Sequence, residues 1–291
     1  MGVDGPDDFD LPDFGDLSAG DSAEPRSRVA VEERDRIEYW EDLRAAVAAD
    51  AWDVVAERFR WQWTSHCERW PAESRPPADR SGDPPGSWRG DGGRYLDATA
   101  NAEVEKRCEG IAEVERDVVS PAMREIEACD PDRQLVGFDH RLKGLDRLKD
   151  KVAADVLFKS RTPEQALANV KDPVRYTFQY GEAAYTEAAC TDMDRLRGHG
   201  FQQVELRNSW TDSHYRGINS RWRDPATGQL FEVQFHTRTS YEAKQLTHAV
   251  YERLRSPGTL DAERDELEVL QEKACGHIPI PRNATDIPDF P

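Results

Sequence analysis

The order of the elements expected across residues 140–255 constrains the fold more than any other feature of this chain. Apolar residues at three-to-four spacing predict helices, and apolar residues in strict alternation predict strands. Four segments read as strands and are separated or flanked by helical segments: DPVRYTFQY, FQQVELRNSW, YRGINSRWRD and LFEVQFHT. The turn PATGQ joins the last two strands, as in a hairpin. This order predicts an α+β fold with a mixed, mainly antiparallel sheet flanked by helices.

Composition divides the chain into four regions with different expected structures. The first is rich in Asp, Gly, Pro and Ser and too poor in apolar groups to offset the entropy of ordering, so we expect a disordered acidic leader. A helical module, a strand-rich domain, and a C-terminal helix with a proline-rich tail follow it. The boundaries of the four regions are 1–30, 31–130, 131–260 and 261–291.

Two local signals organise the helical module. Residues 71–93 concentrate Pro and Gly and predict a long irregular connection. Ser120 followed by Pro121 is typical of an N-cap and a first helical residue, so a new helix is expected there.

Charge and cysteine content exclude several classes of protein. The chain has 57 acidic and 39 basic residues and a formal net charge of −18, which disfavours a general nucleic-acid coat. A site for an anionic substrate must therefore be a local island of Lys and Arg. No apolar run reaches the ~20 residues of a membrane span, and the N-terminal segment lacks the pattern of a secretory signal peptide. We expect a cytoplasmic protein, or one exported by a route that uses no classical signal peptide.

The five cysteines are scattered and lack CxxC spacing. This pattern favours unpaired thiols in a reducing compartment and disfavours a zinc site.

A basic stretch, RLKGLDRLKDK, opens the strand-rich region. On a helix, its Arg141, Lys143 and Lys151 would point in more than one direction, which is typical of a solvated face balanced by Asp146 and Asp150. The alternative is a clamp for polyphosphate, because Arg offers bidentate contacts and Lys a point charge.

Two carboxylates accompany the expected strands. Asp172 precedes a strand, either as an ordinary entry turn or as a Mg²⁺ ligand. Glu232 lies in FEVQFHT, where it alternates with apolar residues and shares one face with Gln234 and His236. That face is either wet surface or the floor of a site. Together, two carboxylates near a basic stretch are the minimum equipment for phosphoryl or pyrophosphoryl transfer.

Other polar residues allow the same two interpretations. Tyr215 and Asn219, with Arg216 between them, offer stacking and hydrogen bonds to a base, or form an ordinary edge strand. His248 and Tyr251 follow on the next helix.

These motifs occur in an order that resembles a known family. Residues ~138–255 are similar to the synthetase domain of RelA/SpoT-type alarmone synthetases, which transfer pyrophosphate from ATP to the 3′-hydroxyl of a purine nucleotide. The similar motifs, in chain order, are RLKGLDRLKDK, KDPVRYTF, YRGIN, FEVQFHT and THAVYE. The variant YRGIN…FEVQFHT, preceded by DPPGSWRGDGGRYLD, looks more like the domains found in actinobacterial polymorphic toxins.

The resemblance implies a role for each matching residue. The implied ATP-binding residues are Arg141, Lys143, Lys151 and Arg175. The implied Mg²⁺ ligands are Asp172 and Glu232, and Glu232 would also activate the acceptor hydroxyl. The implied acceptor contacts are Tyr215, which would stack on the base, and Asn219, Gln234 and His236. Supporting roles are implied for His248 and Tyr251.

The departures from the family pattern leave the acceptor open. The glycine expected after Asp172 is missing and Arg175 follows at a shorter spacing, while Asn219 replaces a histidine and His236 an arginine. The acceptor is then a guanosine nucleotide, an adenosine nucleotide or the end of an RNA, and an immunity protein is an implied partner of a toxin. ADP-ribosyl or nucleotidyl transfer and non-catalytic nucleotide binding are the alternative functions.

Overall fold

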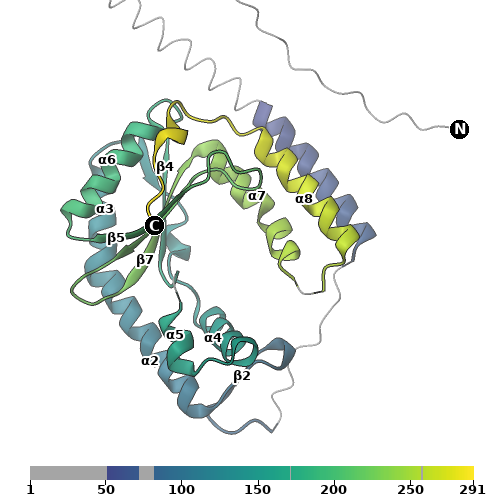
Figure 1. The fold of residues 1–291 in the computed structure, drawn as a ribbon, viewed down its shortest axis with the longest axis vertical. Coiled ribbons are helices and arrows are strands. Elements are labelled where there is room, and N and C mark those ends of the chain that lie inside the picture. The colour runs from purple at the N-terminus through teal and green to yellow at the C-terminus, as the bar shows by residue number, and fades with distance from the viewer. Residues whose placement is uncertain (1–50, 72–81, 171, 257) are drawn as a thin grey trace, which may run out of the picture. The chain divides into compact units, whose positions relative to one another are not determined.

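The computed structural model describes residues 51–71, 82–170, 172–256 and 258–291 (Figure 1). The expected leader and the first part of the helical module lie outside the described residues. All described residues belong to one compact unit, Ala45–Pro291.

A five-stranded sheet forms the centre of this unit, with strand order β3-β4-β7-β6-β5. The strands are β3 (Arg133–Leu135), β4 (Arg175–Tyr180), β5 (Gln202–Asn208), β6 (Ile218–Arg223) and β7 (Leu230–Thr237). β4 and β7 are parallel, and every other neighbouring pair is antiparallel. The predicted α+β fold with a mixed, mainly antiparallel sheet is confirmed. The edge strand β3 was not predicted, because three residues carry too little alternation to be recognised.

The helices lie close to the positions that the sequence pattern predicts. Their bounds are α2 (Ala98–Val114), α3 (Ser120–Ala128), α4 (Leu145–Lys159), α5 (Pro163–Ala168), α6 (Tyr185–Gly198), α7 (Arg238–Leu254) and α8 (Asp261–Gly276). Residues 51–69 are also helical. Thr162 caps α5 through a reciprocal capping box with Gln165.

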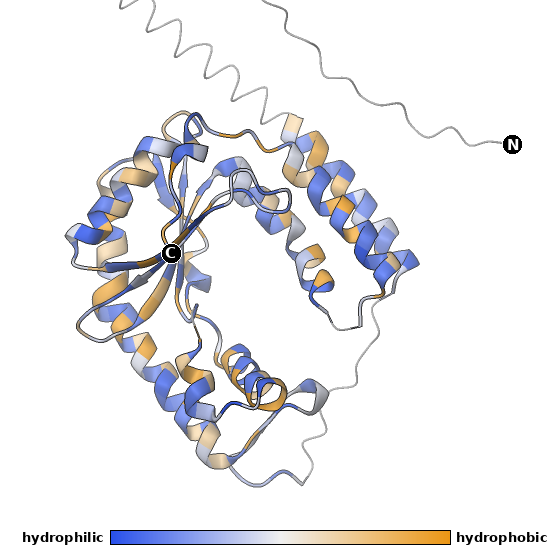
Figure 2. Ribbon diagram, viewed as in Figure 1, coloured by the Kyte–Doolittle hydropathy of each residue, from blue (hydrophilic) through white to orange (hydrophobic). Residues whose placement is uncertain are grey.

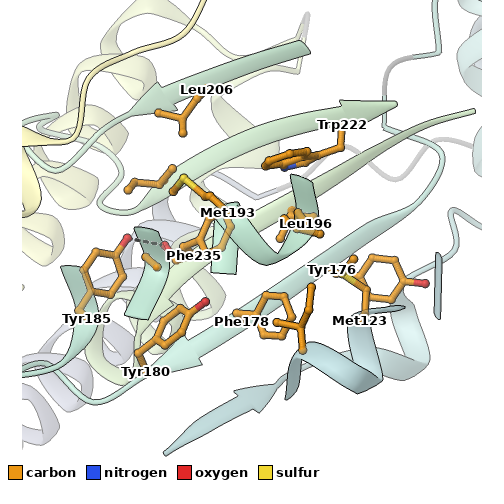
Figure 3. Close-up of a cluster of buried hydrophobic side chains, with 14 of the residues drawn as sticks. Met123, Tyr176, Phe178, Tyr180, Tyr185, Met193, Leu196, Leu206, Trp222 and Phe235 are labelled. Carbon is orange, nitrogen blue, oxygen red and sulfur yellow. Dashed lines mark hydrogen bonds between the residues drawn. The ribbon is translucent and has the colours of Figure 1, made fainter. Parts of the chain in front are cut away.

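The apolar face of the sheet packs against α3 and α6 (Figure 3). Alternation sends Tyr176, Phe178 and Phe235 to this face, where they are almost fully buried. Tyr185 of α6 reaches the sheet and donates a hydrogen bond of 2.9 Å from its hydroxyl to the carbonyl of Phe235 (Figure 3). In Figure 2 hydrophobic and hydrophilic residues are interspersed along the helices and strands, as expected of elements with one buried side. The other face is left for polar side chains.

Ser120 does not begin a separate helix as predicted. A π-helical turn, Glu115–Val119, joins α2 to α3 without a break. Pro121 lacks an N–H and its ring crowds the carbonyl four residues earlier, and a π turn relieves both problems. The Ser120 hydroxyl donates to the Glu115 carboxylate instead of capping a helix.

The end of the segment expected to be an irregular connection, residues 71–93, provides the first strand of a small antiparallel ribbon. β1 (Trp88–Arg89) pairs with β2 (Tyr95–Leu96), and both pack against α4. The Trp88 indole donates a hydrogen bond of 3.2 Å to Asp146, and Arg94 pairs with Asp150. Two of the acidic residues of α4, Asp146 and Asp150, are therefore bound by this ribbon and its turn.

The C-terminal tail lacks long regular elements, as predicted, yet it is part of the packed structure. Phe290 exchanges backbone hydrogen bonds of 2.8 and 3.0 Å with Leu206 on the edge strand β5. Ile278, Ala284 and Ile287 are buried in the main core. The tail therefore covers one edge of the sheet.

All five cysteines are free thiols, in agreement with their scattered positions. No helix among the described residues is long and apolar enough to span a membrane.

Candidate functional site

One face of the sheet carries polar side chains along its central strands. Arg175 of β4 stands opposite Glu232 of β7, and Thr177 stands opposite Gln234. Asn219 of β6 pairs with Gln234 from the other side. Because paired residues share a face, these side chains lie side by side.

This polar face is not ordinary wet surface. Gln234 is 4% exposed and His236 is fully buried. Buried polar groups need partners, and the following contacts supply them.

The basic stretch reaches this face by a route that the sequence did not predict. Residues 141–143 precede the helix rather than belonging to it, and Leu142 forms an antiparallel bridge with Val174, just after Asp172. Lys143 N–H donates to the carbonyl of Pro173 at 2.9 Å, and Arg175 N–H donates to the carbonyl of Arg141 at 2.8 Å. The helix α4 begins only at Leu145. Lys143 thus comes from the segment before α4 and Lys151 from the helix.

Asp172 holds both lysines. Lys143 Nζ lies 2.7 Å from Asp172 Oδ2, and Lys151 Nζ lies 2.6 Å from Oδ1. Burial opposes the charge of this carboxylate, but the hydrogen bonds from the two lysines outweigh burial and lower its pKa to about 2. Burial and the neighbouring cations Lys151 and Arg175 lower the pKa of Lys143, despite its bond to Asp172.

Arg175 brings the two carboxylates together. Its Nε lies 3.2 Å from Glu232 Oε2, and its Nη2 lies 3.4 Å from Asp172 Oδ2. Gln234 Nε2 donates to the other oxygen of Glu232, Oε1, at 2.5 Å. Asp172 and Glu232 therefore lie on the same side of the sheet, within reach of one group.

The donor set fits a magnesium ion shared with substrate. Mg²⁺ is usually held by one or two carboxylates plus substrate phosphates. Asp172 and Glu232 supply such a pair, and Arg175, which bridges them, is a long side chain that is 43% exposed. The described residues contain no cluster of three or more His, Cys, Asp or Glu side chains that would hold a metal ion without substrate.

Lys244 is a residue of this site that the sequence reasoning missed. It projects from α7, and its ammonium group donates to the amide oxygen of Gln234. Burial and the charge of Arg175 lower its pKa to about 8, while Glu232 opposes this shift. A signal was present in the sequence, since Lys244 precedes His248 by one helical turn.

We call four positive side chains the cation cluster: Lys143, Lys151, Arg175 and Lys244. Two carboxylates contact or face this cluster among the described residues, Asp172 and Glu232. The cation cluster therefore keeps excess positive charge in a chain whose net charge is −18. Such an island favours a polyanion.

Arg141 lies beside the site, but a carboxylate within the protein holds its guanidinium. Arg141 Nε lies 2.6 Å from Glu115 Oε1, and its Nη2 lies 3.3 Å from Oε2. The guanidinium also stacks on Phe138, with its carbon 4.2 Å from the ring centroid. Burial opposes the charge of Glu115, yet hydrogen bonds from Arg141, Ser120 and Tyr176 lower its pKa. Arg141 is thus held flat at the edge of the site. Glu115 was not predicted, since nothing in its helix distinguishes it from a surface carboxylate.

Tyr215 is the centre of a second polar group on the same face. Its hydroxyl donates to Asn219 Oδ1 at 2.9 Å and shares a hydrogen bond of 2.8 Å with His236 Nε2. His236 Nδ1 shares another bond of 2.8 Å with the Ser240 hydroxyl. Burial, reinforced by the charge of Lys244, lowers the pKa of His236 well below its usual range, so the imidazole is neutral.

Asn219 and His236, which differ from the motifs that this chain resembles, are therefore linked through the Tyr215 hydroxyl. Asn219 and His236 both bond the Tyr215 hydroxyl. Gly217 belongs to the same arrangement, because a Cβ there would lie 2.7 Å from the His236 ring and its φ is +147°. The three positions form one packed unit.

α8 and the tail hold the loop that carries Tyr215. Gln271 donates to the carbonyl of His214 at 2.9 Å, and Arg216 donates to the carbonyl of Ile278 at 3.0 Å.

His248 and Tyr251 lie further along α7. Their side chains are 55% and 42% exposed, and they interact with Glu252 and Arg255 rather than with the carboxylates of the site. They share one helix face with Lys244 but do not join its contacts.

Several solved structures match part of this chain at low sequence identity and low TM-score. The small alarmone synthetase 1 from Bacillus subtilis is 15% identical, with 59% of this chain and 90% of that chain covered and a TM-score of 0.42. The same synthetase bound to its product pppGpp is 15% identical, with 64% and 96% covered and a TM-score of 0.44.

A GTP pyrophosphokinase family protein from Streptococcus pneumoniae is 15% identical, with 60% and 89% covered and a TM-score of 0.38. No protein-family model and no curated protein matches the chain. Function therefore has to be argued from the side chains.

Proposed function

We propose that the protein transfers pyrophosphate from ATP to the 3′-hydroxyl of a purine nucleotide or of an RNA end, with Mg²⁺. One observation carries this proposal: Asp172 and Glu232 meet at Arg175, beside a cation cluster with excess positive charge. The ordered motifs that resemble RelA/SpoT-type synthetases support it from the sequence. A triphosphate is the kind of anion that such a cluster fits.

In this proposal the cation cluster binds the phosphates of ATP. Lys143 and Lys151 exchange part of their contact with Asp172 for contact with phosphate oxygens. Arg175 contributes a planar guanidinium suited to bidentate contacts. Arg141, held flat by Glu115, lies at the edge of the site as a surface for adenine.

Glu232 would accept the proton of the acceptor hydroxyl. The hydroxyl oxygen then attacks the β-phosphorus of ATP, the bond between the α- and β-phosphates breaks, and AMP leaves. Asp172 and Glu232 would hold Mg²⁺, which when bound neutralises charge on the phosphates. Gln234 and Arg175 orient the Glu232 carboxylate for its role.

Tyr215 would face the acceptor base. Its hydroxyl is occupied by Asn219 and His236, so its ring is the part that remains for stacking. Because His236 is neutral, this end of the face adds no positive charge to the acceptor site.

An acceptor panel tests the proposal. The protein is incubated with Mg²⁺, ATP and each of GDP, GTP, AMP, ADP or tRNA, and AMP release is measured. We expect AMP with at least one acceptor and a loss of about 10²- to 10⁴-fold in Glu232→Gln, the range of a lost general base. No AMP with any acceptor would contradict the proposal, as would full activity in Glu232→Gln. NAD consumption without AMP would favour ADP-ribosyl transfer.

A product of this kind would make the protein a stress-signal enzyme or a toxin. Induced expression in a bacterial host would then arrest growth, and Glu232→Gln would not. Growth arrest by both proteins would contradict this role. Co-purification from the source cells is the test for an immunity partner.

A further inference from the structure

Glu232 belongs to a chain of polar contacts that ends at Lys244. Gln234 Nε2 donates to Glu232 Oε1 at 2.5 Å, and Lys244 donates to Gln234 Oε1. Thr177 also donates to that amide oxygen, at 3.5 Å. Gln234 lies between a carboxylate and an ammonium group, and it is almost fully buried.

The two partners of Gln234, Lys244 and Glu232, allow only one orientation of its amide. An ammonium group can only donate, so it requires the amide oxygen. A carboxylate can only accept, so it requires the amide NH₂. If the lysine were removed, the amide could turn and direct its oxygen at Glu232, which would repel the carboxylate.

We propose that Lys244 is a positioning residue that fixes the amide of Gln234 so that Gln234 holds Glu232 in its working orientation. This inference rests on the proposed function of Glu232 and assigns Gln234 to orientation rather than to the acceptor. Lys244 acts on the Glu232 carboxylate through the amide of Gln234. Gln234 donates to one oxygen of Glu232 and Arg175 donates to the other, so each carboxylate oxygen is bound by one donor.

The surroundings of Lys244 disfavour a positive charge at this position. Arg175 faces it from β4, Glu232 and His236 face it from β7, and Tyr241 lies on its own helix with the ring centroid 5.6 Å from Nζ. A half-buried lysine near Arg175 is electrostatically unfavourable unless a favourable contact offsets the cost of its charge. The hydrogen bond from Lys244 to the amide oxygen of Gln234 is such a contact.

A double-mutant cycle tests the inference through kcat. Lys244→Met and Gln234→Leu should each lower kcat by about 10- to 100-fold, the usual effect of removing an outer partner of a site ligand. If Lys244 acts through Gln234, the double variant should be within about twofold of Gln234→Leu, because coupled residues are not additive. The KM for the acceptor should change less than about threefold in Lys244→Met. Lys244→Arg should restore at least part of kcat.

Two outcomes would overturn the inference. Losses that multiply in the double variant would show that Lys244 and Gln234 act separately. A raised KM for the acceptor with unchanged kcat would show that Lys244 binds substrate directly. Arg238→Met is the matched control for loss of a cation from α7, since Arg238 is exposed and pairs with Glu242 on its own helix. This variant should leave kcat unchanged.

Metal–nucleotide binding separates this inference from the proposed function. Calorimetry with Mn²⁺ and α,β-methylene-ATP should show weaker binding in both single variants and no further loss in the double variant. Wild-type protein that binds the complex but releases no AMP would contradict the proposed function alone. Independent losses of affinity in this cycle would contradict the inference alone.

Discussion

Asp172 and Glu232 contact two nitrogens of a single guanidinium, that of Arg175, at 3.4 and 3.2 Å. The parallel pairing of β4 with β7 creates this relationship, because it sets Arg175 directly opposite Glu232. Asp172 precedes β4 by three residues, so the same strand start delivers both Asp172 and Arg175 to the face of Glu232. Lysine and arginine side chains therefore pair with both carboxylates of the site.

The lowered pKa of Asp172 predicts a pH-dependent stability difference. A carboxyl with a folded pKa of about 2 stabilises the fold above its unfolded pKa, and this stabilisation is lost as the pH falls through the folded pKa. At pH 6, wild type should exceed Asp172→Asn by about 2 kcal/mol in free energy of unfolding, and the difference should vanish near pH 2. Urea denaturation across this range measures it. A difference that does not vary with pH would show that the ion pairs with Lys143 and Lys151 add no stability.

Removing the charge of Lys244 should raise the stability of the protein, whereas removing that of Asp172 should lower it. Its pKa is lowered to about 8, so the charged form is disfavoured in the fold below pH 8, and this cost disappears as the pH rises toward the unfolded pKa. At pH 7 the shift corresponds to about 3 kcal/mol, less about 1 for the lost hydrogen bond. Lys244→Met should therefore be more stable than wild type by about 2 kcal/mol at pH 7, with a smaller gain at pH 10. A destabilised Lys244→Met at pH 7 would contradict this prediction.

Much of the fold could be predicted because its strands alternate strictly and its turns are marked by Gly and Pro. Phe231, Val233 and Phe235 identified β7 and its polar face from sequence alone. The parallel neighbour of β7 could not be predicted, since strand pairing depends on the whole chain. Residues 141–143 were mistaken for part of a helix for the same reason: backbone hydrogen bonds to Pro173 and Arg175 override their local pattern.

The candidate site divides in a similar way. Motif order predicted the pair Asp172 and Glu232, which the structure brings to one guanidinium. Lys244 was missed because the meaning of a lysine on an amphipathic helix depends on which strand its side chain meets. The contact between Asn219 and His236 through Tyr215 also depends on tertiary structure, although each residue was singled out separately.

Gly217 should tolerate no side chain while His236 is present. A Cβ would lie 2.7 Å from the imidazole and would stand at φ +147°, a conformation that side chains rarely adopt. Gly217→Ala should cost about 1–3 kcal/mol in free energy of unfolding, the usual range for such strain. In a His236→Ala background the cost should fall, because the ring contact is gone. Equal costs in both backgrounds would show that His236 does not restrict this position.

Tyr215 variants separate stacking from hydrogen bonding. Tyr215→Phe keeps the ring but leaves His236 and Asn219 without their shared partner, so it should lose about 1–3 kcal/mol of stability. Tyr215→Leu also removes the stacking surface, worth about 1–3 kcal/mol per base, and should raise the acceptor KM by roughly 10-fold or more. The KM for ATP should be unchanged in both variants. Equal acceptor KM values for Phe and Leu would contradict a stacking role.

Transfer of label from ATP tests the central claim most directly. The protein is incubated with Mg²⁺, the best acceptor and ATP labelled at either the α- or the γ-phosphate, and products are separated and weighed by mass spectrometry. Pyrophosphate transfer predicts γ-label on the acceptor, α-label in AMP, and neither product with Glu232→Gln. Appearance of the α-label on the acceptor, or release of ADP in place of AMP, would contradict the account.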